Sequence, residues 1–255
     1  MMKKRTGVLA LAVVSSIGLA GCSQEDLSNS ELLKKATAAQ DDIQSFHMDS
    51  KIFSEVGGMP ISQEVSADAI QKPFAMHQTM KMKNVEDGTD MVVESYMLDD
   101  KMYVQQEDNW IVQDLSDFNE MMESPTSTEQ NLKLLKKYKD NWTAERKDDV
   151  YQIDVKLKGD DLKNFMQEAL EQSGQMAQMK EMMDQIDYKK MDYTMTYDAK
   201  TYYPKTLDME MEFEIAEGTS FKMTNESTFS KFNTIESIEL PEEAKEAQTI
   251  TDMNQ

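Results

Sequence analysis

Apolar and polar residues alternate with a period of two over many short stretches of this chain, and this limits what it can fold into. Met48 and Ile52, for example, alternate with Asp49 and Lys51. Such alternation is typical of β-strands with one buried face, because successive side chains point to opposite sides. Turn residues separate the stretches, so we expect antiparallel hairpins. The pattern predicts about eleven strands, over residues 46–56, 61–69, 74–82, 91–98, 102–104, 110–112, 142–147, 151–157, 193–197, 207–215 and 221–232.

Helical spacing of apolar residues appears in intervals between these strands. Ser30 can cap a first helix, because its hydroxyl can accept a bond from a free backbone N–H, and the apolar spacing continues to about Gln44. A second helical interval covers residues 118–138. These intervals, with no βαβ alternation, predict an α+β fold with an incomplete, highly curved antiparallel β-barrel and helices on its concave face.

The third helical interval follows Gly159. Asp160 is a suitable N-cap, and the apolar stripe over 162–170 has helical spacing. A second stripe over 176–186 comes after Ser173-Gly174. We expect the two stripes to cover the open face of the sheet as a lid, with Ser173-Gly174 as its hinge, because glycine lets the chain turn at little steric cost.

The first 22 residues have the order of a secretory signal: a basic head, an apolar run over 8–17, and small residues before Cys22. Leu19-Ala20-Gly21-Cys22 also resembles a bacterial lipobox, which implies removal of residues 1–21 and acylation of Cys22. An ordinary signal peptide or an uncleaved anchor are the alternatives. We therefore expect a lipidated tether over 22–29, one domain over 30–245 and a polar tail over 246–255.

The chain is strongly acidic, with 48 Asp and Glu against 27 Lys and Arg and a net charge of −21. Phosphate binding requires clustered basic residues, so a nucleic-acid partner is not expected. Attraction to anionic lipid is not expected either, and membrane attachment must come from acyl chains on Cys22. Cys22 is the only cysteine, so no disulfide is expected in the mature chain.

No constellation of catalytic residues is evident in the sequence. The only two histidines, His47 and His77, lie in predicted strands, opposite in face to Phe46 and Met76 respectively. There is no Gly-rich phosphate loop, serine-nucleophile elbow or Cys-His pair. We therefore expect no enzymatic activity, no cofactor and no metal bound by histidine or carboxylate.

Methionine is unusually abundant, with 23 residues. The strand methionines fall on the predicted inward face, where they can fill a core or line a pocket for apolar ligands of variable shape. Thioethers also bind Cu(I), so copper binding through closely spaced pairs such as Met80 and Met82 is a less favoured hypothesis. The predicted cavity-lining residues are Met76, Met80, Met82, Met179, Met183, Met195, Met209, Met211, Phe213 and Met223.

Several short motifs together resemble a known family. They are the lipobox, the segments 32–36 and 43–48, the pair 101–104 and 110–112, and the run 197–206 ahead of a long strand. The chain is similar to uncharacterised lipoproteins of Gram-positive bacteria related to the mycobacterial lipid-binding lipoproteins, which in turn resemble the lipoprotein carrier LolA. The resemblance implies an incomplete barrel with helices plugging its mouth around an apolar cavity.

These observations predict a lipoprotein anchored through Cys22 to the outer face of the cytoplasmic membrane. We expect it to be a carrier or sensor that binds a lipid or acylated molecule. A structural or interaction lipoprotein with a filled core and no ligand is the alternative.

Overall fold

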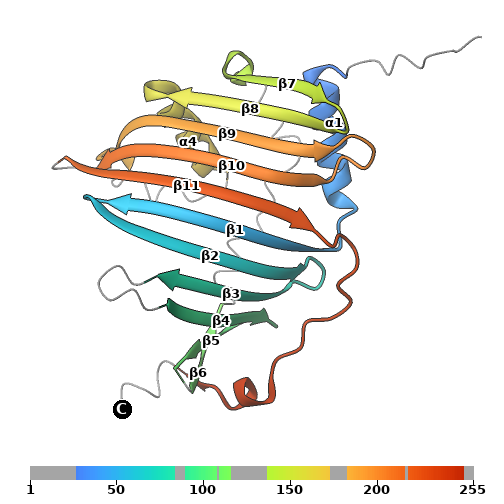
Figure 1. The fold of residues 1–255 in the computed structure, drawn as a ribbon, viewed down its shortest axis with the longest axis vertical. Helices are drawn as coiled ribbons and strands as arrows, with labels where there is room; N and C mark the ends of the chain where they lie inside the picture. The colour runs from blue at the N-terminus through green and yellow to red at the C-terminus, as the bar shows by residue number, and fades with distance from the viewer. Residues whose placement is uncertain are drawn as a thin grey trace, which may run out of the picture.

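A computed structural model of the chain describes residues 27–83, 90–107, 109–115, 137–172, 183–215 and 218–249. Its twelve strands form one sheet in the order β12-β6-β5-β4-β3-β2-β1-β11-β10-β9-β8-β7 (Figure 1). The strands are β1 Ser45–Val56, β2 Met59–Ile70, β3 Ala75–Lys83, β4 Asp90–Leu98, β5 Lys101–Gln106, β6 Asn109–Asp114, β7 Trp142–Lys147, β8 Val150–Lys158, β9 Asp187–Asp198, β10 Pro204–Ile215, β11 Thr219–Ser230 and β12 Gln248–Thr249.

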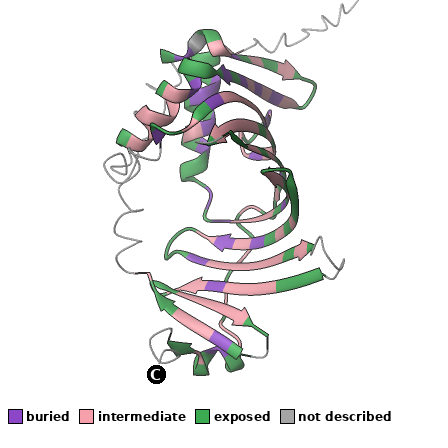
Figure 2. Cartoon of the chain, turned by 90° about the vertical axis from the view of Figure 1, so that its left-hand side faces the viewer, coloured by how far each residue is buried: buried purple, intermediate pink, exposed green. Residues whose placement is uncertain are grey.

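The sheet is strongly curved and open. Seen from the side, it follows a C-shaped course, with helices inside the C (Figure 2). The end strands β12 and β7 do not pair with each other. Every pairing is antiparallel except that of β12 with β6, which is parallel. The predicted α+β fold with an incomplete, curved antiparallel barrel is thus confirmed, with twelve strands in place of about eleven.

Of the helices that lie within the described ranges, α1 (Asn29–Asp41) and α4 (Gly159–Gln172) lie on the concave side. The predicted cap of the first helix is wrong. Ser28, not Ser30, caps α1, because its hydroxyl accepts from the Glu31 N–H and the Glu31 carboxylate accepts from the Ser28 N–H. The helix also ends earlier than expected, at Asp41. In α4 the helical residues begin at Gly159, one residue before the predicted cap Asp160.

The main core lies between these helices and the β7–β10 part of the sheet. Leu32 and Leu33 of α1 and Leu162 of α4 are buried there against strand residues such as Leu157 and Tyr151. Leu157 and Leu162 are fully buried. Burial of apolar side chains is the main stabilising contribution to such packing. The helices therefore cover the β7–β10 half of the concave face.

A second, smaller core lies on the opposite, outer face. Tyr96 of β4 and Trp110 of β6 pack there under the C-terminal segment, which includes the 3₁₀-helix η2 (Glu242–Glu246) with buried Ala244. The segment ends in β12, whose Gln248 and Thr249 pair beside β6. β12 falls within the stretch that the sequence suggested was a polar tail. A further 3₁₀-helix, η1, spans Lys139–Asn141.

Some sequence predictions differ from the structure or lie outside the described residues. Phe74 and Phe232, expected in strands, lie in turns beside β3 and β11. Most of the predicted helical interval over 118–138, the hinge at Ser173-Gly174 and part of the second lid stripe fall outside the described residues. Of the part of the chain that is described, no helix is long and apolar enough to cross a membrane.

A candidate binding face

The strand pairings place every paired side chain on one of two faces. Residues that pair across strands point to the same side, and the side alternates along each strand. Met48 pairs with Ala67 and Phe229, and Asp49 with Ser66 and Thr228. The first set faces the helices and belongs to the concave side, whereas the second set belongs to the outer side.

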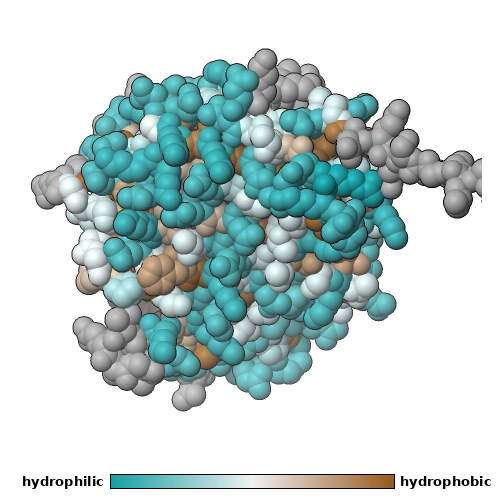
Figure 3. All heavy atoms as spheres, turned by 45° about the horizontal axis from the view of Figure 1, so that its top comes forward, coloured by the Kyte–Doolittle hydropathy of each residue, from teal (hydrophilic) through white to brown (hydrophobic). Residues whose placement is uncertain are grey.

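The two faces differ sharply in charge. Among the paired residues of β1–β11 that the structure describes, Arg146 is the only charged residue on the concave face. It lies on the edge strand β7, where its Nε donates to the carbonyl oxygen of Asp148 at 3.2 Å. The outer face carries the acids and lysines, and Figure 3 shows it obliquely as mostly hydrophilic. The concave face is therefore a neutral surface within a very acidic chain.

The predicted cavity-lining residues of the strands all share this concave face. Met183 is a helical residue just before the turn that leads into β9, and it is only 2% exposed within the main core. Met179 and the lipidation residue Cys22 lie outside the described residues. The strand residues are Met76, Met80 and Met82 of β3, Met195 of β9, Met209, Met211 and Phe213 of β10, and Met223 of β11.

Further methionines join them that the sequence interpretation did not include. Met191, Met211 and Met223 form one row across β9, β10 and β11. A second row on the other half of the sheet is Met76, Met97 and Met102 across β3, β4 and β5. The period of two within β4 and β9 was the signal that could have found Met97 and Met191. The remaining methionines of this face are Met48, Met59 and Met91.

Exposure changes across the concave face. Met195, under the helices, is 8% exposed, whereas the methionines of β3, β10 and β11 are partly exposed. Burial also raises the pKa of Tyr193 and Tyr197 on the covered side, so both phenols stay neutral. The part formed by β1–β4 and β11 is thus an apolar surface that the described helices do not fully cover.

A few neutral polar side chains interrupt the apolar lining. Ser50 and Ser227 are buried and share a hydrogen bond of 2.7 Å between their hydroxyl oxygens. The Ser227 hydroxyl is also 3.1 Å from the Asn225 Oδ1, which can accept from it. Gln63 donates to the Met82 sulfur at 3.6 Å. These contacts add polarity to the middle of the face without adding charge.

A groove of about 580 Å³ lies on the outer face over β3, β2, β1, β11 and β10. It is lined mainly by short hydroxyl and charged side chains, including Ser66, Thr79 and Thr228. The Ser66 hydroxyl hydrogen-bonds to Asp49 and is the main cause of the lowered pKa of that carboxyl. This groove is polar and is not the apolar cavity that the sequence predicts.

Both histidines lie on the outer face as well. His47 Nδ1 is 2.6 Å from Asp68 Oδ1, and His77 Nε2 is 2.9 Å from Glu94 Oε1. His77 also stacks on Tyr96 at 4.4 Å between ring centroids. Across the described part of the chain, no group of three or more His, Cys, Asp or Glu residues is placed to hold a metal ion. The histidines thus make local hydrogen bonds with carboxylates away from the concave face.

Several solved structures are similar to this chain at low sequence identity. The lipoprotein LppX of Mycobacterium tuberculosis is 16% identical, with 83% of this chain and 100% of that chain covered and a TM-score of 0.47. LprF of Mycobacterium bovis is 10% identical, with 83% and 96% covered and a TM-score of 0.44. A DUF1329 family protein of Desulfovibrio piger is 12% identical, with 82% and 93% covered and a TM-score of 0.29.

These likenesses are too low to carry an argument about function. No curated protein is significantly similar in sequence to the chain. One family model does match, described as a family of unknown function, DUF6612, and it covers residues 28–249. The match runs from the cap of α1 to the last residue of β12 and so includes every helix and strand described above. The chain therefore belongs to the DUF6612 family.

Proposed function

We propose that this chain is a lipid-anchored extracytoplasmic protein that binds an apolar ligand on its concave face without catalysing a reaction. The observation that carries the proposal is the near absence of charge on that face: Arg146 alone among the described, paired strand residues. Charged residues make up 29% of the whole chain. A random distribution over both faces would put many charges on this side, so the separation needs a cause.

Core packing is the cause only under the helices. There, burial explains the apolar side chains, as Leu157 and Met195 illustrate. Over β1–β4 and β11 the same neutral lining continues with partly exposed side chains such as Met80 and Met223. Covering them would release about 25 cal/mol per Å² of apolar area. Methionine suits such a surface, since its flexible thioether adapts to ligands of different shape.

Anchoring through Cys22 is the second part of the proposal. The lipobox-like sequence ends five residues before Leu27, the first described residue. Two or more acyl chains on Cys22 would hold the domain stably at a membrane. The net charge of −21 makes electrostatic attachment to anionic lipid an unsuitable substitute.

A pair of substitutions on one strand tests ligand binding. Met80 faces the concave side and its neighbour Thr79 faces outward. Met80→Glu places a carboxylate among apolar side chains and should weaken binding of a fluorescent acyl probe by roughly tenfold or more. Thr79→Glu adds the same charge on the outer face and should bind as the parent chain does, with both variants checked for folding by circular dichroism.

Mass spectrometry of lipid extracts from the purified protein gives an independent answer. We expect a hydrophobic species that survives washing. If the extract is empty and the parent chain binds no acyl probe, the ligand-binding proposal is wrong, and the alternative of a structural lipoprotein with a filled core takes its place.

Copper binding has one specific observation in its favour. Met191, Met211 and Met223 lie side by side on adjacent strands, which are about 4.8 Å apart in a sheet. Thioethers are soft ligands that select Cu(I). Competition with a Cu(I) chelator tests this second candidate, and failure to retain Cu(I) in the parent chain would remove it.

A further inference from the structure

The exposed large apolar residues are concentrated at one end of the sheet. This end is where the β1–β2, β3–β4 and β10–β11 hairpins turn (Figure 1). Seven large apolar side chains are exposed among the described residues. Six of them lie in the strand residues nearest to these hairpin turns. We call these six the hairpin rim: Phe53, Met59, Ile61, Met91, Val92 and Ile215. The seventh, Phe74, lies at the other end of the sheet.

The hairpin rim is continuous with the concave face. Met59, Ile61, Met91 and Ile215 all point to the concave side by their pairings. Ile61 pairs with Ser54, next to the row of partly buried Met223 and Met211. Just inside the rim, Phe213 and Phe221 stack at 4.5 Å between ring centroids. An apolar chain could therefore pass from the rim onto the concave face without crossing a charged residue of the described strands.

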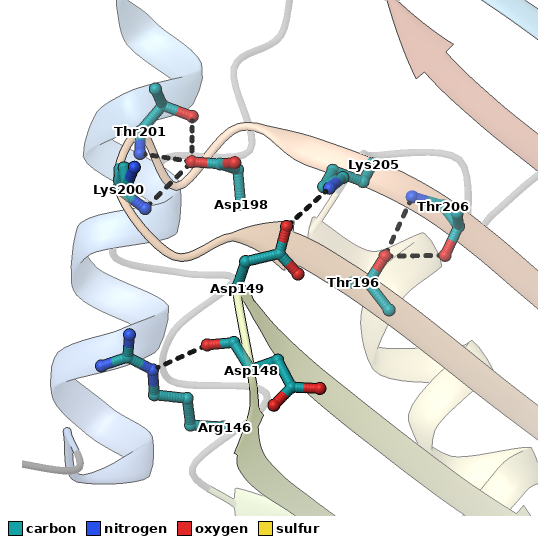
Figure 4. A network of polar contacts seen from close by, with 9 residues as sticks. All are labelled: Arg146, Asp148, Asp149, Thr196, Asp198, Lys200, Thr201, Lys205 and Thr206. Atoms are coloured by element: carbon teal, nitrogen blue, oxygen red, sulfur yellow. Dashed lines mark hydrogen bonds and ion pairs between the residues drawn. The ribbon is translucent and has the colours of Figure 1, made fainter.

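At the opposite end of the sheet, the part formed by the turns of β7–β10 is closed and polar. Helix α1 runs along that end (Figure 1), and its Lys35 Nζ lies 3.1 Å from the Tyr202 hydroxyl. The turns there are held by polar contacts, such as the 3.7 Å ion pair of Lys205 with Asp149 and the bonds that Asp198 accepts from the Lys200 and Thr201 N–H groups (Figure 4). Of the exposed large apolar side chains in the described strands and turns, Phe74 alone lies at that end, so the hairpin rim is the larger apolar opening of the face.

The charges beside the rim are slightly acidic, as in the whole chain. Glu55, Asp90 and Glu214 lie on the outer side of the last strand residues, together with Lys83 and Lys222. A slightly acidic set gives no attraction to an anionic surface and little repulsion from a neutral one. Contact through the rim would therefore depend on its apolar side chains.

We infer that the hairpin rim is a contact surface for a neutral lipid bilayer, through which the ligand enters and leaves the concave face. Exposed apolar side chains at separate loop ends suit the boundary between headgroups and acyl chains, where each can be buried independently. The inference rests on the proposed function for its second part, the exchange of ligand. The lipid contact itself can be measured without any ligand.

The test uses the absence of other thiols. With Cys22 acylated, Met59→Cys and Met91→Cys each introduce a single reactive thiol in the full processed chain. Each is labelled with an environment-sensitive dye, and the protein is mixed with phosphatidylcholine vesicles that carry nitroxide groups on their acyl chains. Phe74→Cys is the matched control, because Phe74 is 52% exposed and Met91 53%. The parent chain without an added cysteine reports any labelling at Cys22.

We expect several-fold more quenching at positions 59 and 91 than at position 74, with no need for anionic lipid. Equal quenching at all three positions, quenching only with anionic lipid, or none at 59 and 91 would overturn the inference. A rim that docks on a protein gives this last result. Binding of the acyl probe is measured on the same samples. If the acyl probe binds but no quenching occurs, only the proposed bilayer contact of the hairpin rim is wrong. If quenching occurs but the acyl probe does not bind, only the proposed ligand binding is wrong.

Discussion

Asn233 joins three parts of the fold that are distant in sequence, and its replacement gives a sharp test of how they are held. Its Oδ1 accepts from the backbone N–H of Gln44 at 2.6 Å and of Ser45 at 3.4 Å. Its Nδ2 donates to the Asp42 carbonyl at 3.2 Å and to the Tyr203 hydroxyl at 3.3 Å. The side chain thus ties the end of α1 and the start of β1 to the chain after β11.

The backbone of Asn233 adds a second contribution, because its φ is +57°. Asparagine tolerates this left-handed region better than alanine, and glycine tolerates it without strain. A neutral hydrogen bond contributes about 0.5–1.5 kcal/mol, and two of the four bonds are long. Asn233 is exposed, so water replaces part of what is lost. We expect Asn233→Gly to lower the free energy of unfolding by about 2 kcal/mol and Asn233→Ala by about 1 kcal/mol more.

Urea denaturation followed by circular dichroism measures both variants, with the m-value checked for constancy. Asn233→Asp is the control, since it keeps the oxygen that accepts from Gln44 and loses the amide donor. It should lie between the parent chain and Asn233→Gly. Equal stability of the alanine and glycine variants would refute the backbone argument, and an aspartate variant as unstable as alanine would refute the importance of the accepting oxygen.

Two further predictions concern the anchor and the pH dependence of stability. Cys22→Ala should leave the fold intact and move the protein from the membrane fraction to soluble or unprocessed forms; a variant still cleaved after Gly21 and still membrane-bound would contradict the lipobox. Burial and a hydrogen bond to Glu94 raise the pKa of Tyr96 from 10.0 to about 12, so the folded state holds this proton more tightly and stability should fall between pH 10 and 12. Tyr96→Phe should reduce that fall, and an unchanged pH profile of unfolding would contradict it.

Much of the sheet could be predicted from local alternation. In the stretches around Met48 and Met209, the alternation places methionine on one face of the strand and acidic residues on the other. The strand pairings confirm that the acids point outward. Which face is concave could not be read in this way, because it depends on where Leu33 and Leu162 pack. Curvature and helix placement are properties of the whole assembly, whereas alternation is a property of each strand.

The errors have physical causes that differ from one another. The capping box of Ser28 and Glu31 has the Ser-x-x-Glu spacing and was present in the sequence, but Ser30 lay nearer to the first apolar residue. β12 could not be predicted from local pattern, since its two residues pair with Ile111 and Val112 from far earlier in the chain. The lid prediction remains open at Met179, so Met179→Asp stays a useful variant for the proposed binding face.

An unclosed sheet has two edge strands, and an edge strand can pair with strands from other molecules. β12 occupies part of one edge by pairing beside Ile111 and Val112 of β6. The other edge strand, β7, is only six residues long and carries Glu145, Arg146 and Lys147. Short, charged edge strands disfavour edge-to-edge pairing of one sheet with another. The domain can therefore keep the adjustable width of an open sheet, which a closed barrel lacks, without polymerising along its hydrogen-bonding direction.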